Sequence, residues 1–447
     1  MKKKIVLFLL MLILISSNDC FAKDVQNKTS IKGNVEENVI LSIDECIKKA
    51  LENNPAIASA VNSTDIYKNK IGQEWANYFP ELSVSTGYTR SNPIITNTPV
   101  RNQSFNNYSL GMLSMNQLIY DFGKTSTSLN FSKNTYESYK NNLQSIINDT
   151  IFNVKDAYYY LLYTIQQEAV LMDTVEKFEN HLEQTKAFYE IGTRPKVDFI
   201  MAEYNLSSAK LNYIKAKNEV EMAFARLNNA MGLPEEKKYN VKDKLEKKEY
   251  DIRFEKIIEK AYEQRPELMA LKNKAKASES LVKLSQKTLL PDLSAFGSFG
   301  IGGSEIAGDK GFSVGVKLDL PLANAYLIKK QIAEAKSVHK RDLSDTEKLR
   351  QEVFLEVKQA YIKLNEAEER LPVSELSLKQ AKEQYNIIDG RYTEGLATPI
   401  ELKDAELVHR TAQLEFYKSL LDYNFAVANL ERVIGDGIIE IKSENRL

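Results

Sequence analysis

The sequence predicts a mainly α-helical protein with a membrane β-barrel portion, built by internal duplication. Three observations predict this class. Long segments contain almost no glycine or proline, four segments of about ten residues alternate apolar and polar side chains, and most of the chain matches itself at a nearly constant offset. Helices of such length are typical of coiled coils, and strands that are apolar on one face are typical of membrane barrels.

The N-terminal segment has the pattern of a secretory signal peptide. Lysines at 2–4 precede an apolar run at 5–15, and the small residues Cys20 and Ala22 allow cleavage after Ala22. We therefore assign residues 1–22 to a signal peptide, because the apolar run is too short to span a bilayer. Retention as an uncleaved anchor and lipidation at Cys20 are alternatives, although Asp19 disfavours lipidation.

Composition excludes several function classes. The chain of 447 residues has a formal net charge of −1, so nothing favours nucleic acid as a partner. Cys46 is the only cysteine after the signal peptide, so no disulfide framework is expected. His181, His339 and His409 are too scattered to form a metal site, and no catalytic grouping is visible. We expect no enzymatic activity, no cofactor and no metal.

The chain is a duplication. Residues 41–57 match 251–268 at an offset of 211, and later segments match at 203, as Gly232 does with Gly435. This arrangement predicts the following divisions: a first repeat at 23–234, a charged joint at 235–250, a second repeat at 251–437 and a tail at 438–447.

The four alternating segments are predicted strands of a membrane sheet. They lie at about 80–91, 106–119, 291–301 and 311–321. Phe312 and Val314 face one way while Ser313 faces the other, and aromatic residues such as Trp75 and Tyr120 flank the strands. A sheet in lipid must close, and four strands cannot close. Three chains supply twelve strands, enough for an aqueous lumen, so we expect a homotrimer in contact with membrane lipid.

The remaining segments are predicted long helices, at 122–190, 196–231, 324–390 and 398–434. At ~1.5 Å per residue, the longest would reach roughly 100 Å. Small residues recur at intervals of seven, which indicates helix pairs in coiled-coil hairpins. These seam residues are Ala202, Ala209, Ala216, Ala223, Ala405 and Ala412. The alanine row alone fits a tunnel wall or an ordinary bundle core equally. Pro372 predicts a bend or break in the third helix.

Each helix pair is joined by a similar break, YEIGTRPKVDF at 189–199 and YTEGLATPIELKD at 392–404. Gly192 and Gly395 allow the left-handed conformation that reverses the chain. Asp198, Glu401 and Asp404 open the following helices. These acids suit a helix N-terminus, and in a trimer they would also form acidic rings that attract cations.

The whole mature chain resembles the outer membrane efflux proteins, the TolC-like channel-tunnels. The resemblance rests on FPELS at 79–83, LPDLS at 290–294, QLIYDFG at 117–123 and the doubled break. It implies a trimeric twelve-stranded barrel in the outer membrane of a diderm bacterium, continued by a periplasmic α-helical tunnel. It also implies docking to a periplasmic adaptor (membrane fusion) protein and an inner-membrane pump of RND, ABC or MFS type, as in tripartite efflux or type I secretion.

By this resemblance the two breaks, which we call the first tip (189–199) and the second tip (392–404), form the periplasmic end. Tyr189, Gly192, Arg194 and Gly395 would lie where the adaptor docks. Glu401 and Asp404 match the family's acidic constriction, and with Asp198 and Tyr392 they are the expected gate.

One departure concerns the closing contacts at the tips. The arginine of some members falls on Ala397, whereas Arg194 occupies the corresponding place in the first tip. We therefore expect a different set of closing contacts in this chain, with the second tip as the gate and the first as its latch.

The competing hypothesis for the whole protein is a periplasmic coiled-coil adaptor or scaffold that forms no pore and has no membrane strands.

Overall fold

The computed structural model describes residues 40–91, 105–233, 239–243, 245–247, 253–303, 308–321 and 325–435. The expected signal peptide (1–22) and tail (438–447) lie outside the described residues, as does part of the charged joint.

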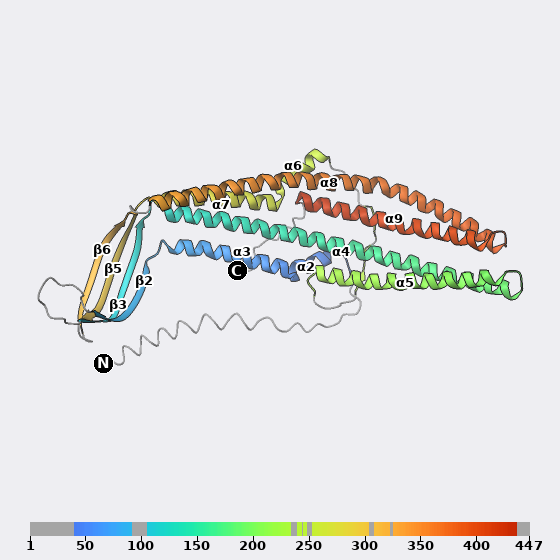
Figure 1. Ribbon diagram of the computed structural model, residues 1–447, viewed down its shortest axis with the longest axis horizontal. Coiled ribbons are helices and arrows are strands. Elements are labelled where there is room, and N and C mark those ends of the chain that lie inside the picture. Colours follow the sequence, from blue (N-terminus) through green and yellow to red (C-terminus); the bar gives the residue numbers. More distant parts are fainter. Residues whose placement is uncertain are drawn as a thin grey trace.

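The described chain forms an elongated body with a sheet at one end and two helix tips at the other (Figure 1). The first half contains β1 (Ile40–Leu41), α2 (Ile43–Asn53), α3 (Pro55–Ala76), β2 (Glu81–Ser91), β3 (Phe105–Tyr120), α4 (Lys124–Glu190) and α5 (Lys196–Ala230). The second half contains β4 (Asn240–Val241), α6 (Phe254–Gln264), α7 (Pro266–Lys287), β5 (Asp292–Gly303), β6 (Asp309–Asp319), α8 (Ala325–Thr393) and α9 (Pro399–Ile434).

The two halves repeat one unit, and the same local chemistry starts it each time. A short helix ends in an extended residue, and proline then occupies the first position of the next helix, as Pro55 in α3 and Pro266 in α7. Proline fits there because the first helical N–H has no partner within the helix. The duplication predicted from the sequence is therefore present in the fold.

The sheet is antiparallel in the order β2-β3-β5-β6. Each repeat contributes one pair of neighbouring strands, and the two pairs join where β3 lies beside β5. Its apolar side chains are exposed in the single chain, with Phe312 82% and Val314 81% accessible. β2 and β6 form the two edges, and neither has a second neighbour among the described strands. The four predicted strands are confirmed, and the sheet is open in one chain.

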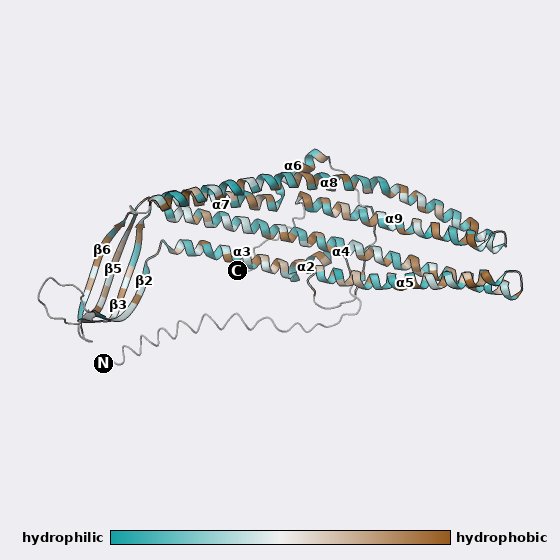
Figure 2. Cartoon of the chain, viewed as in Figure 1, coloured by the Kyte–Doolittle hydropathy of each residue, from teal (hydrophilic) through white to brown (hydrophobic). Residues whose placement is uncertain are grey.

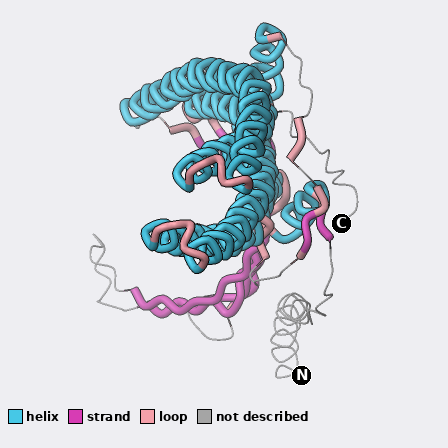
Figure 3. The backbone as a smooth tube through the Cα atoms, turned by 90° about the vertical axis from the view of Figure 1, so that its right-hand side faces the viewer, coloured by secondary structure: helices cyan, strands magenta, loops and turns pink. Residues whose placement is uncertain are grey.

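α4 and α8 extend from the sheet to the tips, where each turns back into a shorter helix, α5 or α9, so that the chain forms the two helical hairpins α4–α5 and α8–α9 (Figure 1). Ala202, Ala209, Ala216, Ala223 and Ala405 are buried along their seams, which agrees with close helix packing at intervals of seven residues. Ala412 is only half-buried. Viewed from the tip end, the helices follow a curved arc (Figure 3), which favours a wall over a bundle closed around its own centre.

Of the bend or break predicted at Pro372, the break is wrong. α8 runs without interruption from Ala325 to Thr393 with Pro372 inside it. Near this position the Ser374 hydroxyl donates a hydrogen bond to the Leu371 carbonyl at 2.8 Å. Packing of α8 along α9 and α7 stabilises the helix more than one missing backbone hydrogen bond destabilises it.

The main core lies midway along the body, where the joint packs on the first repeat. The Tyr158 hydroxyl is 2.7 Å from the Asp243 carboxylate and 3.1 Å from the Leu41 carbonyl oxygen. Asp243 also accepts from the Ile43 backbone N–H at 3.1 Å. These contacts hold the joint, β1 and α4 together around the buried Cys46.

Apolar and polar residues alternate along the helices (Figure 2). Among the residues that the structure describes, no helix is both long enough and apolar enough to cross a bilayer.

Candidate functional site at the paired helix tips

Both tips reverse the chain with the same backbone motif. Gly192 and Gly395 adopt φ values of +83° and +75°. The residue after each glycine donates its N–H back across the turn, Thr193 to Phe188 at 3.0 Å and Leu396 to Arg391 at 2.8 Å. Glycine avoids the strain that a Cβ meets in this left-handed conformation, so the doubled glycine has a direct conformational cause.

Arg194 links the first tip to the second. Its guanidinium carbon lies 5.3 Å from the centre of the Tyr392 ring, and its Nη2 donates to the Ala397 carbonyl at 3.5 Å. Its Nη1 lies 3.6 Å from the Asp198 carboxylate. Arg194 thus lies beside Ala397, the position where the resemblance implied an arginine, and Ala397 contributes only its backbone oxygen.

Tyr392 lies in the seam between the two hairpins and is only 1% exposed. Its hydroxyl is 3.4 Å from the Thr185 hydroxyl, and its ring meets the His181 ring edge-on at 4.8 Å between centroids. Burial, and next the charge of Arg194, lower the pKa of His181. The second tip is therefore seated on α4 through a desolvated aromatic contact.

The three predicted gate acids do not gather within one chain. Glu401 closes a capping box at the start of α9, where its carboxylate accepts from the Thr398 N–H at 2.6 Å and from the Thr398 hydroxyl at 2.9 Å. These hydrogen bonds lower the pKa of Glu401. Asp404 is exposed, and Asp198 pairs with Arg194. Any ring of these acids requires further copies of the chain.

Tyr189 is the remaining predicted tip residue. It is 39% exposed and stacks on Phe199, with 5.9 Å between ring centroids. The structure therefore brings together Arg194, Asp198 and Tyr392, and it leaves Tyr189 and Asp404 on the surface.

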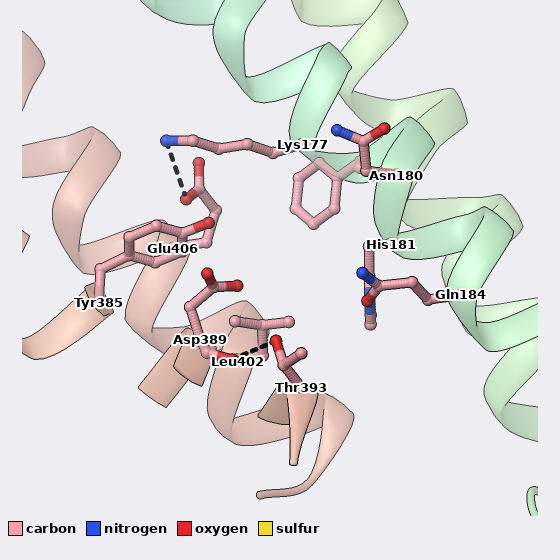
Figure 4. A pocket seen from close by; sticks show the side chains of 10 residues that line it. Lys177, Asn180, His181, Gln184, Tyr385, Asp389, Thr393, Leu402 and Glu406 are labelled. Atoms are coloured by element: carbon pink, nitrogen blue, oxygen red, sulfur yellow. Dashed lines mark hydrogen bonds and ion pairs between the residues drawn. The ribbon is translucent and has the colours of Figure 1, made fainter. Parts of the chain in front are cut away.

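A polar pocket that was not predicted from the sequence lies behind the tips (Figure 4). A cavity of about 250 Å³ lies between α4 and the α8–α9 hairpin. Charged and polar side chains from all three helices line it, including Lys177, His181, Tyr385, Asp389 and Glu406. The sequence does not distinguish Glu406 as a buried acid, because Glu203 follows the seam residue Ala202 in the same way and is exposed. Within the described residues, no group of three acidic, histidine or cysteine side chains could hold a metal ion.

The chain is similar to an outer-membrane protein and to a protease secretion protein. It is 19% identical over 410 residues to the outer membrane protein TolC of Escherichia coli, covering 87% of this chain and 81% of that protein. It is 25% identical over 189 residues to the alkaline protease secretion protein AprF of Pseudomonas aeruginosa, covering 42% of this chain and 38% of that protein.

Solved structures share the fold. The Campylobacter jejuni CmeC outer membrane channel matches with a TM-score of 0.79 and 19% identity, over 89% of this chain and 86% of that one. The open state of the Neisseria gonorrhoeae MtrE outer membrane channel matches with a TM-score of 0.74 and 19% identity, over 88% of each chain.

The sequence pattern that defines the outer membrane efflux proteins matches residues 46–233 and 257–436, which correspond to the two repeats. The chain belongs to the outer membrane efflux protein family.

Proposed function

We propose that three copies of this outer membrane efflux protein form a passive exit duct of a tripartite efflux or type I secretion system, opened at its periplasmic tips. One observation carries the proposal. A sheet with an exposed apolar face and two free edges continues directly into helices of 67 and 69 residues. In this proposal the duct is passive, and the energy for transport comes from the inner-membrane pump.

The sheet supports the trimer. β2 and β6 present unpaired backbone groups, which lipid cannot hydrogen-bond. Joining β6 of one copy to β2 of the next closes a barrel, and three copies make one wide enough for a water-filled lumen. The exposed apolar residues then face lipid. A pore-free coiled-coil scaffold offers no reason for such a sheet.

The helices support the tunnel. At ~1.5 Å per residue, α4 spans roughly 100 Å away from the sheet. Three curved layers placed side by side would enclose a tube in line with the barrel. We propose that this tube extends through the periplasm toward an adaptor and an inner-membrane pump.

The tips support the gate. The Arg194–Tyr392 contact holds the second tip against the first within a chain, and three such contacts would keep the tube narrow. In the trimer, Glu401 and Asp404 would form acidic rings at this constriction. Adaptor contact at the surface around Tyr189, Gly192 and Gly395 would part the tips.

The experiment compares two lysine substitutions on neighbouring strand residues. Val84 is on the exposed apolar face of β2, and Ser83 is on the opposite face. A lysine on the lipid face costs ~2–4 kcal/mol near the bilayer midplane, whereas a lysine in the lumen is tolerated.

We expect the wild-type chain and Ser83→Lys to form outer-membrane trimers that conduct in planar bilayers. We expect Val84→Lys to form no such trimers and to give no conductance. Equal assembly of both variants, or trimers that never conduct, would contradict the proposal.

A further inference from the structure

The pocket behind the tips encloses an acidic side chain that the duct does not require. The cavity lies between α4, which belongs to the first hairpin, and α8 and α9, which form the second. Any movement that separates the hairpins at their tips must open this seam. Groups enclosed here therefore change their solvation when the tips part.

Glu406 is the most deeply buried acid of the pocket, with 3% of its surface exposed. One carboxyl oxygen is 3.5 Å from the Thr174 hydroxyl. The other, Oε2, has no hydrogen-bond donor among the described residues. Lys177 Nζ lies 3.8 Å from Oε2 (Figure 4), a distance beyond a hydrogen bond.

Lys177 is already committed elsewhere. Its ammonium is 2.8 Å from the Asp173 carboxylate and lies 4.8 Å from the centre of the Tyr385 ring. It therefore neutralises Glu406 only in part. An ionised carboxylate buried with an unpartnered oxygen is costly, whereas the protonated form removes the charge and gives that oxygen a proton to donate to water in the cavity.

We propose that Glu406 is a proton-operated lock, which carries a proton while the two hairpins are packed and ionises when they part. Each chain then releases one proton on opening. The inference rests on the proposed opening at the tips.

Charged and titratable groups surround Glu406 on each of the packed helices. They are Asp173, Lys177 and His181 on α4, Lys382, Tyr385 and Asp389 on α8, and His409 and Arg410 on α9. Burial raises the pKa of Glu406; Lys177 and Arg410 offset this increase in part, and Asp173 adds to it.

The sign of the pH effect follows from this direction. The packed state holds the extra proton, so acid favours packed tips, and this preference is lost as the pH rises through the raised pKa of Glu406. His181 and His409 act in the opposite sense, because burial lowers the pKa of each and the packed state loses stability as the pH falls through their ordinary range. A variant at Glu406 is needed to separate the two effects.

The test uses the full trimer in planar bilayers between about pH 5 and pH 8. In Glu406→Gln the neutral amide imitates the protonated acid. In the wild type, ionisation of Glu406 should raise the ratio of open to closed channels with increasing pH, by up to about tenfold per pH unit for each titrating chain. We expect Glu406→Gln to lose this rise. Glu203→Gln is the matched control, since Glu203 occupies the equivalent position on α5 and is exposed. It should titrate like the wild type.

A second variant shifts the response in a predicted direction. Lys177→Met removes the nearest cation, so the pH at which the channel opens should move upward. An infrared titration of the purified trimer supplies a readout that needs no conductance, because the protonated carboxyl band lost in Glu406→Gln reports Glu406 directly.

The lock is supported if that band is present in the closed channel and disappears over the pH range in which the channel opens, together with the two shifts in pH response. It is overturned if Glu406 is ionised in the closed channel, or if Glu406→Gln titrates like Glu203→Gln. Absence of conductance in every protein would refute the proposed duct, while the infrared titration would still decide the protonation of Glu406.

Discussion

Arg194→Ala should loosen the second tip, and the size of the effect follows from its contacts. The guanidinium–Tyr392 contact is worth about 0.5–2 kcal/mol. The partly exposed pair with Asp198 adds about 0–1 kcal/mol, and the 3.5 Å hydrogen bond to Ala397 adds little. Loss of about 1–2 kcal/mol per chain raises the population of parted tips by about 5–30-fold.

Hydrogen exchange measures this population directly. In the purified trimer, amides at 385–400 should exchange faster in Arg194→Ala by that factor, while amides along the middle of α8 should not change. The exchange rate of these tip amides in Arg194→Lys should lie between those of the wild type and Arg194→Ala, because lysine keeps the positive charge but lacks the planar group that stacks on Tyr392. Lys196→Ala, an exposed neighbour, is the control.

A double-mutant cycle with Tyr392→Leu decides whether loss of the Arg194–Tyr392 contact causes the faster exchange. We expect a coupling of about 0.5–2 kcal/mol between the two positions. Unchanged exchange in Arg194→Ala, or additive effects in the cycle, would refute the latch.

Three further predictions concern the tips and the seam. Gly395→Ala should destabilise the second tip by about 1–2 kcal/mol, because Gly395 has a φ of +75°. Gly390→Ala, the control inside α8, should stabilise the helix by up to about 1 kcal/mol. Thermal unfolding of the two variants measures both effects. Ala209→Leu should overpack the α4–α5 seam and lower stability by about 1–3 kcal/mol, while Ala225→Leu at an exposed site of the same helix should have little effect, and equal melting temperatures would contradict the seam. Glu401→Gln combined with Asp404→Asn should weaken block of the channel by divalent cations; unchanged conductance and block would exclude the acidic rings.

The repeated architecture could be predicted from the sequence because its causes are local or periodic. A lack of glycine and proline predicts α4, alternation predicts β6, and the left-handed glycines predict both tips. Pro372 shows where this reasoning fails. A propensity describes one residue in isolation, and α8 remains continuous because long contacts with α7 and α9 outweigh the missing hydrogen bond.

The contacts of the candidate site depended on tertiary structure. The sequence identified Arg194 and Tyr392 as residues of two separate tips, and only packing of the hairpins brings the guanidinium over the ring. Glu401 and Glu406 are both acids early in α9, yet one caps the helix in solvent and the other is buried in the seam. The sequence alone determined where the chain reverses, which segments form strands and which segments are duplicated. These features depend on backbone conformation and on the spacing of residues along the chain. Which acid is desolvated, and which arginine meets which tyrosine, depends on how two hairpins more than two hundred residues apart pack together, and only the tertiary structure decides that.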